Sequence, residues 1–243
     1  MSLGVAHKVS ERAATAPRRT AARQTPRQEN IVAAESSRDS LGYVFGKRAL
    51  DLFVATTAVI LTGPVMAAIA IAIRLESKGS VLFGHVRLGK SGKAFRCLKF
   101  RTMRAGAQEE LLANPVLKRR YVENDYKVPL EEDFRITRVG HFLRKSSLDE
   151  LPQLFNVIAG SMSLVGPRPI VDEELHWYDD RADLFLSVKP GITGVWQVQG
   201  RSRIGYPNRT EVELEGIRER SFWRDLRVLI TSIPAVITAR GSL

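Results

Sequence analysis

The feature that most constrains this chain is a run of 22 residues without a charged side chain, from Leu52 to Ile73. As a straight helix rising ~1.5 Å per residue, the run would be ~33 Å long, which is enough to cross the hydrocarbon core of a bilayer. A surface helix of a soluble domain carries polar residues on its outer face, and this run carries no charge at all. The run therefore predicts a membrane-associated segment, with a buried core helix as the alternative.

Two features favour a segment that enters the membrane and returns over one that crosses it. Pro64 has no amide hydrogen and its ring clashes with the carbonyl of Ile60, so we expect the helix to kink or break at the Gly63-Pro64 pair. A crossing helix prefers its excess of Lys and Arg on one side. Here basic residues flank both ends of the run: Lys47, Arg48, Arg74 and Lys78.

Charge indicates the kind of partner. The chain has 37 Lys and Arg against 26 Asp and Glu, a formal net charge of +11, which favours nucleic acid, phosphorylated metabolites or an anionic membrane face. Residues 1–45 are rich in Arg, Ala, Ser and Pro, and they predict a disordered basic tail. A membrane helix over residues 46–76 and a catalytic domain over residues 77–243, on the cytosolic face, would follow. Cys97 is the single cysteine, so no intramolecular disulfide and no cysteine-based zinc site can form.

The remaining pattern predicts an α+β fold with short elements. Strands are expected over residues 80–84 and 94–101, around a Gly-rich turn. Helices are expected over residues 107–127 (broken at Pro115), 139–145, 150–159, 170–181 and 222–239. The last of these suits an amphipathic helix at the membrane interface and suits a core helix equally well.

Two adjacent carboxylates, Asp149 and Glu150, open one of these helices. Capping explains such a pair as well as catalysis does. Asp149 could be the N-cap, or Ser147 and Glu150 could form a capping box. Taken alone, the pair is weak evidence of catalysis.

Arg168 stands between two prolines in the segment Gly166–Pro169. The proline rings restrict the backbone, so the guanidinium is presented from a stiff loop, and such a fork suits phosphate. The segment Lys189–Arg201 follows, with turn glycines, a tryptophan, amide side chains and an arginine. A nucleotide site could use these groups, although each also fits a rigid turn.

Four blocks in this order resemble the monotopic phosphoglycosyl transferases, a family of bacterial sugar transferases. The blocks are Lys47–Asp51 with the apolar run, Leu98–Met103, Leu143–Asn156, and Gly166–Pro169 together with Pro190–Arg201. The resemblance covers residues 47–243. It is strongest to the small enzymes that initiate exopolysaccharide synthesis as undecaprenyl-phosphate galactose or glucose phosphotransferases. One departure stands at Glu213–Ile217, where the family's Asp-x-x-Tyr-Val pattern lacks its tyrosine.

The resemblance implies that a hexose-1-phosphate, galactose or glucose, passes from a UDP-sugar to undecaprenyl phosphate, with release of UMP. Asp149 would be the nucleophile and would form a covalent aspartyl-phosphosugar intermediate, and Glu150 would assist it. Both carboxylates would hold Mg²⁺. By motif position, the phosphate-contacting cations would be Lys99, Arg144 and Arg168, and the nucleotide-binding residues would be Gln197 and Arg201.

The same resemblance implies a monotopic membrane protein with a re-entrant broken N-terminal helix, interfacial amphipathic helices and a small β element. Its place would be the cytoplasmic face of the bacterial inner membrane, and a homodimer is compatible with the family. Two other classes of function remain as alternatives. One is a catalytically silent scaffold for polysaccharide assembly, which the intact acidic pair argues against. The other is a nucleic-acid-binding protein. No nucleic-acid-binding module is recognisable, so nucleic acid is not an expected partner.

Overall fold

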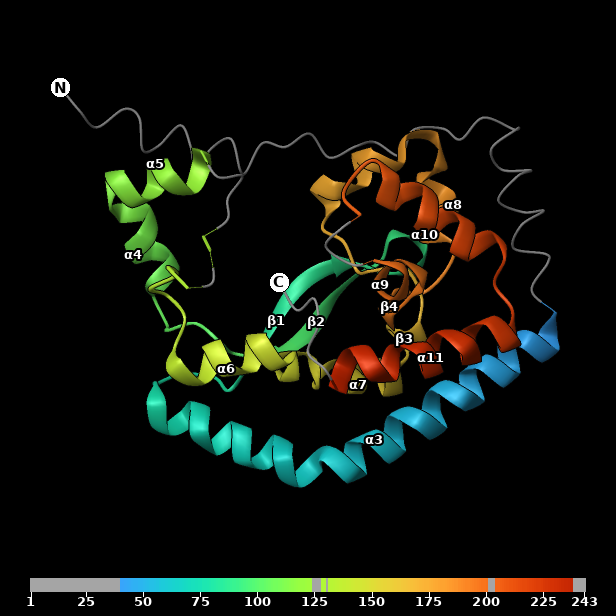
Figure 1. Ribbon diagram of the computed structural model, residues 1–243, viewed down its shortest axis with the longest axis horizontal. Helices are drawn as coiled ribbons and strands as arrows, with labels where there is room; N and C mark the ends of the chain where they lie inside the picture. The colour runs from blue at the N-terminus through green and yellow to red at the C-terminus, as the bar shows by residue number, and fades with distance from the viewer. Residues whose placement is uncertain (1–39, 124–127, 130, 201–203, 238–243) are drawn as a thin grey trace. The chain divides into compact units, whose positions relative to one another are not determined.

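Helices dominate this fold, and the strands form two small two-stranded sheets (Figure 1). The computed structural model describes residues 40–123, 128–129, 131–200 and 204–237. The predicted tail lies outside the described residues, apart from residues 40–45. The elements are, in order, α3 (Leu41–Glu76), β1 (Leu82–Leu88), η1 (Lys90–Gly92), β2 (Ala94–Phe100), α4 (Ala107–Ala113), α5 (Pro115–Glu123), α6 (Arg138–Ser146), η2 (Leu148–Glu150), α7 (Gln153–Ala159), β3 (Ser163–Val165), η3 (Asp172–Arg181), α8 (Ala182–Leu186), β4 (Gly191–Thr193), α9 (Val195–Gln199), α10 (Asn208–Arg218) and α11 (Phe222–Ile237).

The apolar run forms the larger part of α3, a single helix of 36 residues. It begins at Leu41, five residues before the expected start, where the Ser40 hydroxyl accepts a hydrogen bond from the amide of Tyr43. The helix continues through Pro64, so the expected break does not occur. Instead α3 curves along its length (Figure 1). Pro64 is exposed, so the backbone hydrogen bond that it removes lies away from the packed face of the helix.

Most of α3 is not covered by protein. In its most apolar stretch only 17% of the residues are buried, so the alternative of a buried core helix is wrong. By length and composition this helix could cross a membrane. Its outward face carries exposed large apolar side chains, among them Phe53, Ile60, Leu61, Ile71 and Leu75. Such a continuous apolar surface marks a contact with lipid or with another protein.

The N-terminal part of α3 is fixed to the domain by charged side chains. Lys47 Nζ lies 2.7 Å from Asp225 Oδ2 on α11, and it also donates to the Val165 carbonyl at 3.0 Å. Arg48 donates to the carbonyls of Val157 (2.7 Å) and Ile158 (2.9 Å) in the last turn of α7. The Val157 carbonyl also accepts from the amide of the cap residue Gly160 at 3.0 Å, so Arg48 adds a side-chain cap to the backbone cap at the C-terminus of α7.

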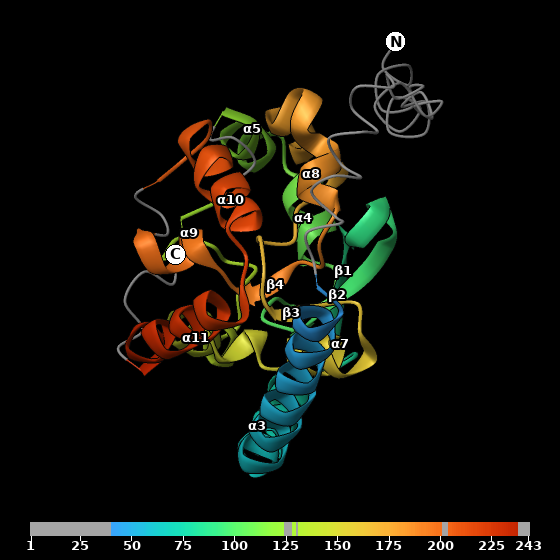
Figure 2. The same ribbon diagram turned by 90° about the vertical axis from the view of Figure 1, so that its right-hand side faces the viewer.

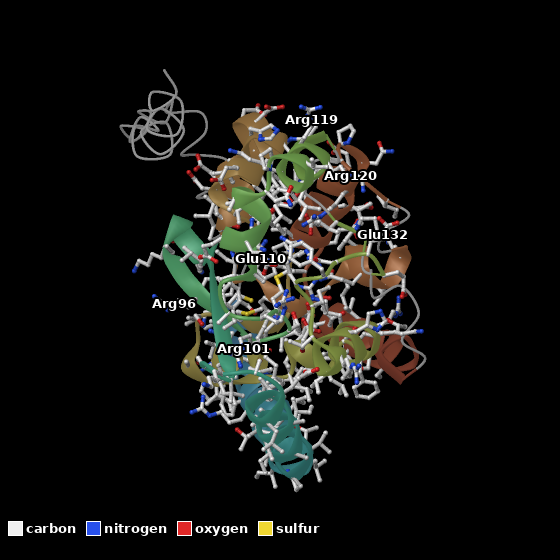
Figure 3. All side chains as sticks on the ribbon, turned by 90° about the vertical axis from the view of Figure 1, so that its left-hand side faces the viewer. Arg96, Arg101, Glu110, Arg119, Arg120 and Glu132 are labelled. Atoms are coloured by element: carbon white, nitrogen blue, oxygen red, sulfur yellow. The ribbon has the colours of Figure 1, made fainter. Side chains whose placement is uncertain are left out.

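The C-terminal end of α3 is fixed to the same domain. The Glu76 carboxylate accepts from the amides of Arg138 (2.7 Å) and Val139 (3.1 Å) at the start of α6. The Arg101 guanidinium donates to the carbonyls of Ser77 and Lys78, and Figure 3 shows Arg101 at the base of the hairpin, beside this helix. One domain therefore holds both ends of the apolar helix.

The hairpin of β1 and β2 is antiparallel and pairs Leu82 with Phe100 and Leu88 with Ala94. The free edge of β2 is covered by the side chain of Asn156 on α7. Its Oδ1 accepts from the Leu98 amide at 2.9 Å, and its Nδ2 donates to the Arg96 carbonyl at 2.9 Å. This two-point contact fixes β2 against α7. The second sheet, β3 with β4, is parallel.

The core is divided among three apolar clusters. The largest joins α3, β2, α7, β3 and α11 through side chains such as Ala55, Val157 and Val228. Figure 2 shows α7 and α11 beside α3. A second cluster joins α3 to Phe100 at the end of β2 and to Leu143 on α6. The third lies around η3, α8 and α10.

Several predicted elements match the structure and others differ. The interruption at Pro115 separates α4 from α5 as expected. Residues 172–181 form 3-10 turns rather than an α-helix, and Asp179, with a φ of 44°, interrupts them. Helix α11 packs on the domain by one face, where Asp225 and Val228 are buried, whereas Trp223 on the same helix is 76% exposed.

Candidate active site

Asp149 and Glu150 lie in η2, a short 3-10 turn between α6 and α7. The chain leaves α6 at Ser147, which takes a left-handed φ of 59°. Helix α7 begins only at Gln153, with Pro152 as its cap residue. Neither capping hypothesis holds, because the 3-10 turn separates both carboxylates from α7 and the Ser147 side chain makes no capping bond. The acidic pair is therefore not explained by helix capping.

Lys99 on β2 faces both carboxylates. Its Nζ lies 2.6 Å from Glu150 Oε1 and 3.7 Å from Asp149 Oδ2. The Asp149 side chain is 12% exposed, and those of Lys99 and Glu150 are 31% and 34% exposed. The group is thus deep but open on one side. The structure brings together three of the predicted site residues from segments about fifty positions apart.

Arg144, in the last turn of α6, lies behind this group. Its Nε donates to the Thr102 hydroxyl at 2.9 Å, just beyond β2. Helix α6 can approach this strand end because Gly140 has no side chain: a Cβ there would lie 2.1 Å from the Thr102 carbonyl oxygen. Burial lowers the pKa of Arg144, and the charges of Asp133 and Asp149 oppose that effect. An arginine remains protonated under such a shift.

The pKa of Asp149 is raised above its ordinary value. Burial is the largest cause, and the charge of Glu150 adds to it. Lys99 and Arg144 act in the opposite direction and favour the ionised form. A carboxylate whose pKa is shifted by burial and by specific charged neighbours is a candidate for a functional group, because such shifts gather at active sites.

Asp133 and Arg135 form a buried ion pair that the sequence did not predict. Their side chains are 2% and 6% exposed, and Arg135 Nε lies 2.7 Å from Asp133 Oδ1. The backbone of this segment is joined to the strand end, with Arg104 N donating to the Arg135 carbonyl at 2.8 Å. Asp133 favours the charged form of Arg144, and the like charge of Arg135 opposes it. No periodic pattern marks these charges as buried, so sequence reasoning had no signal for them.

Arg168 lies outside this group. Its side chain is exposed, and its guanidinium carbon lies 6.0 Å from the centre of the Trp196 ring. The charges of Lys99, Glu150 and Arg168 all act on the buried Cys97 thiol of β2, whose pKa is raised chiefly by burial. Arg168 is therefore near the strand that carries Lys99.

Gln197 lies on α9 and lines a pocket between the N-terminal part of α3 and helices α9, α10 and α11. Its Oε1 atom is buried and has no hydrogen-bond partner among the described residues. The structure does not place it against the acidic pair. Arg201, the other predicted nucleotide-binding residue, lies outside the described residues.

The acidic pair fits a divalent cation of the magnesium type. Asp149 and Glu150 offer hard oxygen donors, and Mg²⁺ is commonly held by one or two carboxylates together with substrate phosphates and water. Within the described residues no group of three or more His, Cys, Asp or Glu side chains could hold a metal ion. The pair would thus form a site that a phosphate substrate completes.

The candidate site thus consists of two adjacent carboxylates faced by cations, on a domain that packs along a largely exposed apolar helix. Residues 42–239 match the family described as bacterial sugar transferase, so the chain belongs to that family. The resemblance seen in its sequence blocks is confirmed.

Three relatives illustrate the similarity. The chain is 42% identical to the undecaprenyl-phosphate galactose phosphotransferase of Salmonella typhimurium, over 89% of this chain and 44% of the relative. It is 42% identical to the exopolysaccharide production protein ExoY of Rhizobium meliloti, over 81% of this chain and 87% of the relative. It is 38% identical to the UDP-glucose:undecaprenyl-phosphate glucose-1-phosphate transferase of Escherichia coli, over 77% of this chain and 39% of the relative.

The chain spans less than half the length of the first and third of these relatives. The same holds for an uncharacterized sugar transferase of Haemophilus influenzae, which is 43% identical and of which the match covers 42%. The matched part of these longer proteins corresponds to nearly all of the domain described above. The ExoY proteins are matched over most of their length.

Proposed function

We propose that this protein transfers a hexose-1-phosphate from a UDP-sugar to undecaprenyl phosphate and so initiates exopolysaccharide synthesis. The observation that carries the proposal is the group formed by Asp149, Glu150 and Lys99: a buried carboxylate beside a second one and a lysine that contacts both. The names of the relatives support the substrates, because they include a galactose phosphotransferase and a glucose-1-phosphate transferase that act on undecaprenyl phosphate.

In the first step, a carboxylate oxygen of Asp149 attacks the β-phosphorus of the UDP-sugar. The bond from that phosphorus to the bridging oxygen breaks, UMP leaves with that oxygen, and a phosphosugar-aspartyl anhydride remains. Lys99 and Arg144 favour the ionised form of Asp149 against the effect of burial, and they offer positive charge where the phosphoryl oxygens gain negative charge. Arg168 would contact the phosphates from its exposed loop.

In the second step, a phosphate oxygen of undecaprenyl phosphate attacks the same phosphorus. The bond to Asp149 breaks, its carboxylate is regenerated, and undecaprenyl diphosphate sugar is released. Dividing one displacement into two is the usual gain of covalent catalysis. Glu150, 2.6 Å from Lys99, would keep the lysine oriented toward the reacting phosphate.

Mg²⁺ held by Asp149 and Glu150 would supply charge neutralisation for the substrate phosphates. Gln197 and Arg201 would bind the nucleotide. The buried Gln197 Oε1, which has no partner among the described residues, supports this role because it needs a donor such as a base N–H.

We propose further that α3 is re-entrant and that the domain lies on the cytoplasmic face of the inner membrane. Both ends of α3 bind the same domain, through Lys47 and Arg48 at one end and Glu76 at the other. A helix that crossed the bilayer would place its ends on opposite sides, where one domain could not hold both. Single cysteines at Ser40 and Lys78, in a protein without Cys97, test this arrangement. Labelling of both by an impermeant reagent from the same side is expected, and labelling from opposite sides contradicts it.

Purified protein in detergent, with Mg²⁺, undecaprenyl phosphate and a panel of UDP-sugars, tests the reaction. UMP release with UDP-galactose or UDP-glucose, dependent on Mg²⁺, is expected. A folded, membrane-extracted protein that releases no UMP with any donor would favour the catalytically silent scaffold. Retention of a radiolabelled sugar phosphate on the protein before acceptor is added would report the covalent intermediate.

A further inference from the structure

The loop that carries Arg168 is held through its backbone. In Pro167-Arg168-Pro169 only Arg168 has an N–H group, because proline has none. This single donor is bonded to Glu213 Oε1 on α10 at 3.0 Å. On the opposite side the Pro167 carbonyl accepts from the Gly191 amide at 2.8 Å. The segment is therefore fixed from two elements, and the Arg168 side chain is left exposed.

Glu213 is a buried carboxylate whose charge is used inside the protein. Its side chain is 1% exposed. Besides the Arg168 amide, it accepts from the Tyr178 hydroxyl and, at 3.3 Å, from the Arg209 guanidinium. A carboxylate buried this deeply is costly unless donors satisfy it, and here three do.

Arg209 is a buried partner and not a second substrate contact. Its side chain is 7% exposed, and its guanidinium lies 4.4 Å from the centre of the Trp196 ring and 4.8 Å from that of Tyr206. The Trp196 ring also faces the guanidinium of Arg168, at 6.0 Å. Glu213 thus reaches Arg168 by two routes: directly at its backbone, and through Arg209 and Trp196 beside its side chain.

We propose that Glu213 is a positioning residue for Arg168, which it holds ready to contact the phosphates of the sugar nucleotide. The inference rests on the proposed function, in which Arg168 binds those phosphates.

A double-mutant cycle on donor kinetics tests the proposal. Glu213→Met keeps the volume and removes the acceptor, and it is expected to lower kcat/KM for the UDP-sugar about 10-fold, mainly through KM. Glu213→Gln keeps an amide oxygen for the Arg168 N–H and is expected to lose less. In an Arg168→Ala background, Glu213→Met should cost no more than about a further twofold, because it acts through the missing side chain.

Three results would overturn the proposal: losses that multiply in the double variant, a Glu213→Gln variant as impaired as Glu213→Met, or an Arg168→Ala variant with wild-type kinetics. The first two are the signs of a merely structural carboxylate. Tyr178→Phe is the matched control, because it removes another donor to the same carboxylate without touching the Arg168 amide. It is expected to lower thermal stability and leave KM unchanged.

Hydrogen exchange in the wild-type protein gives a reading that needs neither activity nor a folded variant. The Arg168 amide is expected to exchange at least about 100-fold more slowly than in an unstructured peptide, because its acceptor is a buried carboxylate. An unprotected Arg168 amide overturns the proposal. If no donor releases UMP but this amide is protected, the proposed function fails while the anchoring of Arg168 stands.

Discussion

Lys99 Nζ lies 2.6 Å from Glu150 Oε1, so a strand and a 3-10 turn 51 residues apart in sequence are joined by one ion pair. The same ammonium lies 3.7 Å from Asp149 Oδ2. A single cation therefore faces two adjacent carboxylates, and the pKa of Asp149 depends on it.

Asp149→Asn is expected to lower UMP release about 10³-fold or more, because the amide keeps the shape of the side chain and removes the nucleophilic oxygen. Asp172→Asn, at an exposed position in η3, is the matched control and should retain activity. UMP release by both variants and the wild type should be measured with the same donor. Full activity of Asp149→Asn would contradict the covalent mechanism.

Lys99→Met is expected to move the acidic limb of the pH profile of kcat/KM to higher pH. Lys99 lowers the pKa of Asp149, so its loss lets that pKa rise further, and the carboxylate is then protonated at a higher pH. As the pH is lowered, the variant should lose activity at a higher pH than the wild type does. The exposed Lys93→Met variant controls for the loss of a positive charge on the same hairpin. An unshifted limb would show that Asp149 does not govern it.

Asp133→Asn is expected to lower the free energy of unfolding by about 3–5 kcal/mol, because it leaves the Arg135 guanidinium buried without its carboxylate. Glu110→Gln breaks the exposed pair with Arg104 and should cost no more than about 1 kcal/mol. Thermal or denaturant unfolding in one detergent compares the two. Equal losses would mean that the buried pair is not what stabilises this segment.

Arg48→Met is expected to cost about 1.5–3 kcal/mol of stability, since it removes two charged hydrogen bonds to the last carbonyls of α7. Lys78→Met, at the other flank of the apolar run, removes the same charge from an exposed position and should cost little. If both variants unfold alike, the basic flanks act by charge alone and not as a helix cap.

Gly140→Ala is expected to reduce activity and stability together. The new Cβ would lie 2.1 Å from the Thr102 carbonyl oxygen, so α6 must move and take Arg144 with it. Gly63→Ala on α3 is the matched control: its Cβ meets nothing within 4 Å, and it should stabilise the helix by about 0.5–1 kcal/mol. Gly140→Ala should therefore lower both the melting temperature and UMP release, whereas Gly63→Ala should raise the melting temperature.

Local patterns predicted the elements better than they predicted their contacts. The hairpin, the interruption at Pro115 and the end of α7 at Gly160 follow from glycine and proline positions, which act within a few residues. Of the kink or break expected at Pro64, the break does not occur: α3 is continuous and curves along its length, and the exposed proline leaves its packed face intact.

The candidate site was predicted only where a motif marked it. Lys99, Arg144, Asp149 and Glu150 do meet, but Asp133 and Glu213 were missed. Both are acidic residues in polar stretches, where a solvated side chain is the ordinary expectation. Asp133 pairs with Arg135 two residues away, and Glu213 is held by Arg209 and by the distant Arg168 and Tyr178, so no periodic pattern reports the burial of either carboxylate.

Helix α3 is bound to the domain at both ends and contacts α7, the helix that follows the acidic pair, between them. Such attachment leaves no hinge about which the domain could swing toward or away from the lipid. Attachment at both ends fixes the position of Asp149 relative to the apolar helix. If α3 lies in the membrane as proposed, changes in lipid composition would alter how much protein is membrane-bound and would leave the distance from Asp149 to the membrane surface constant.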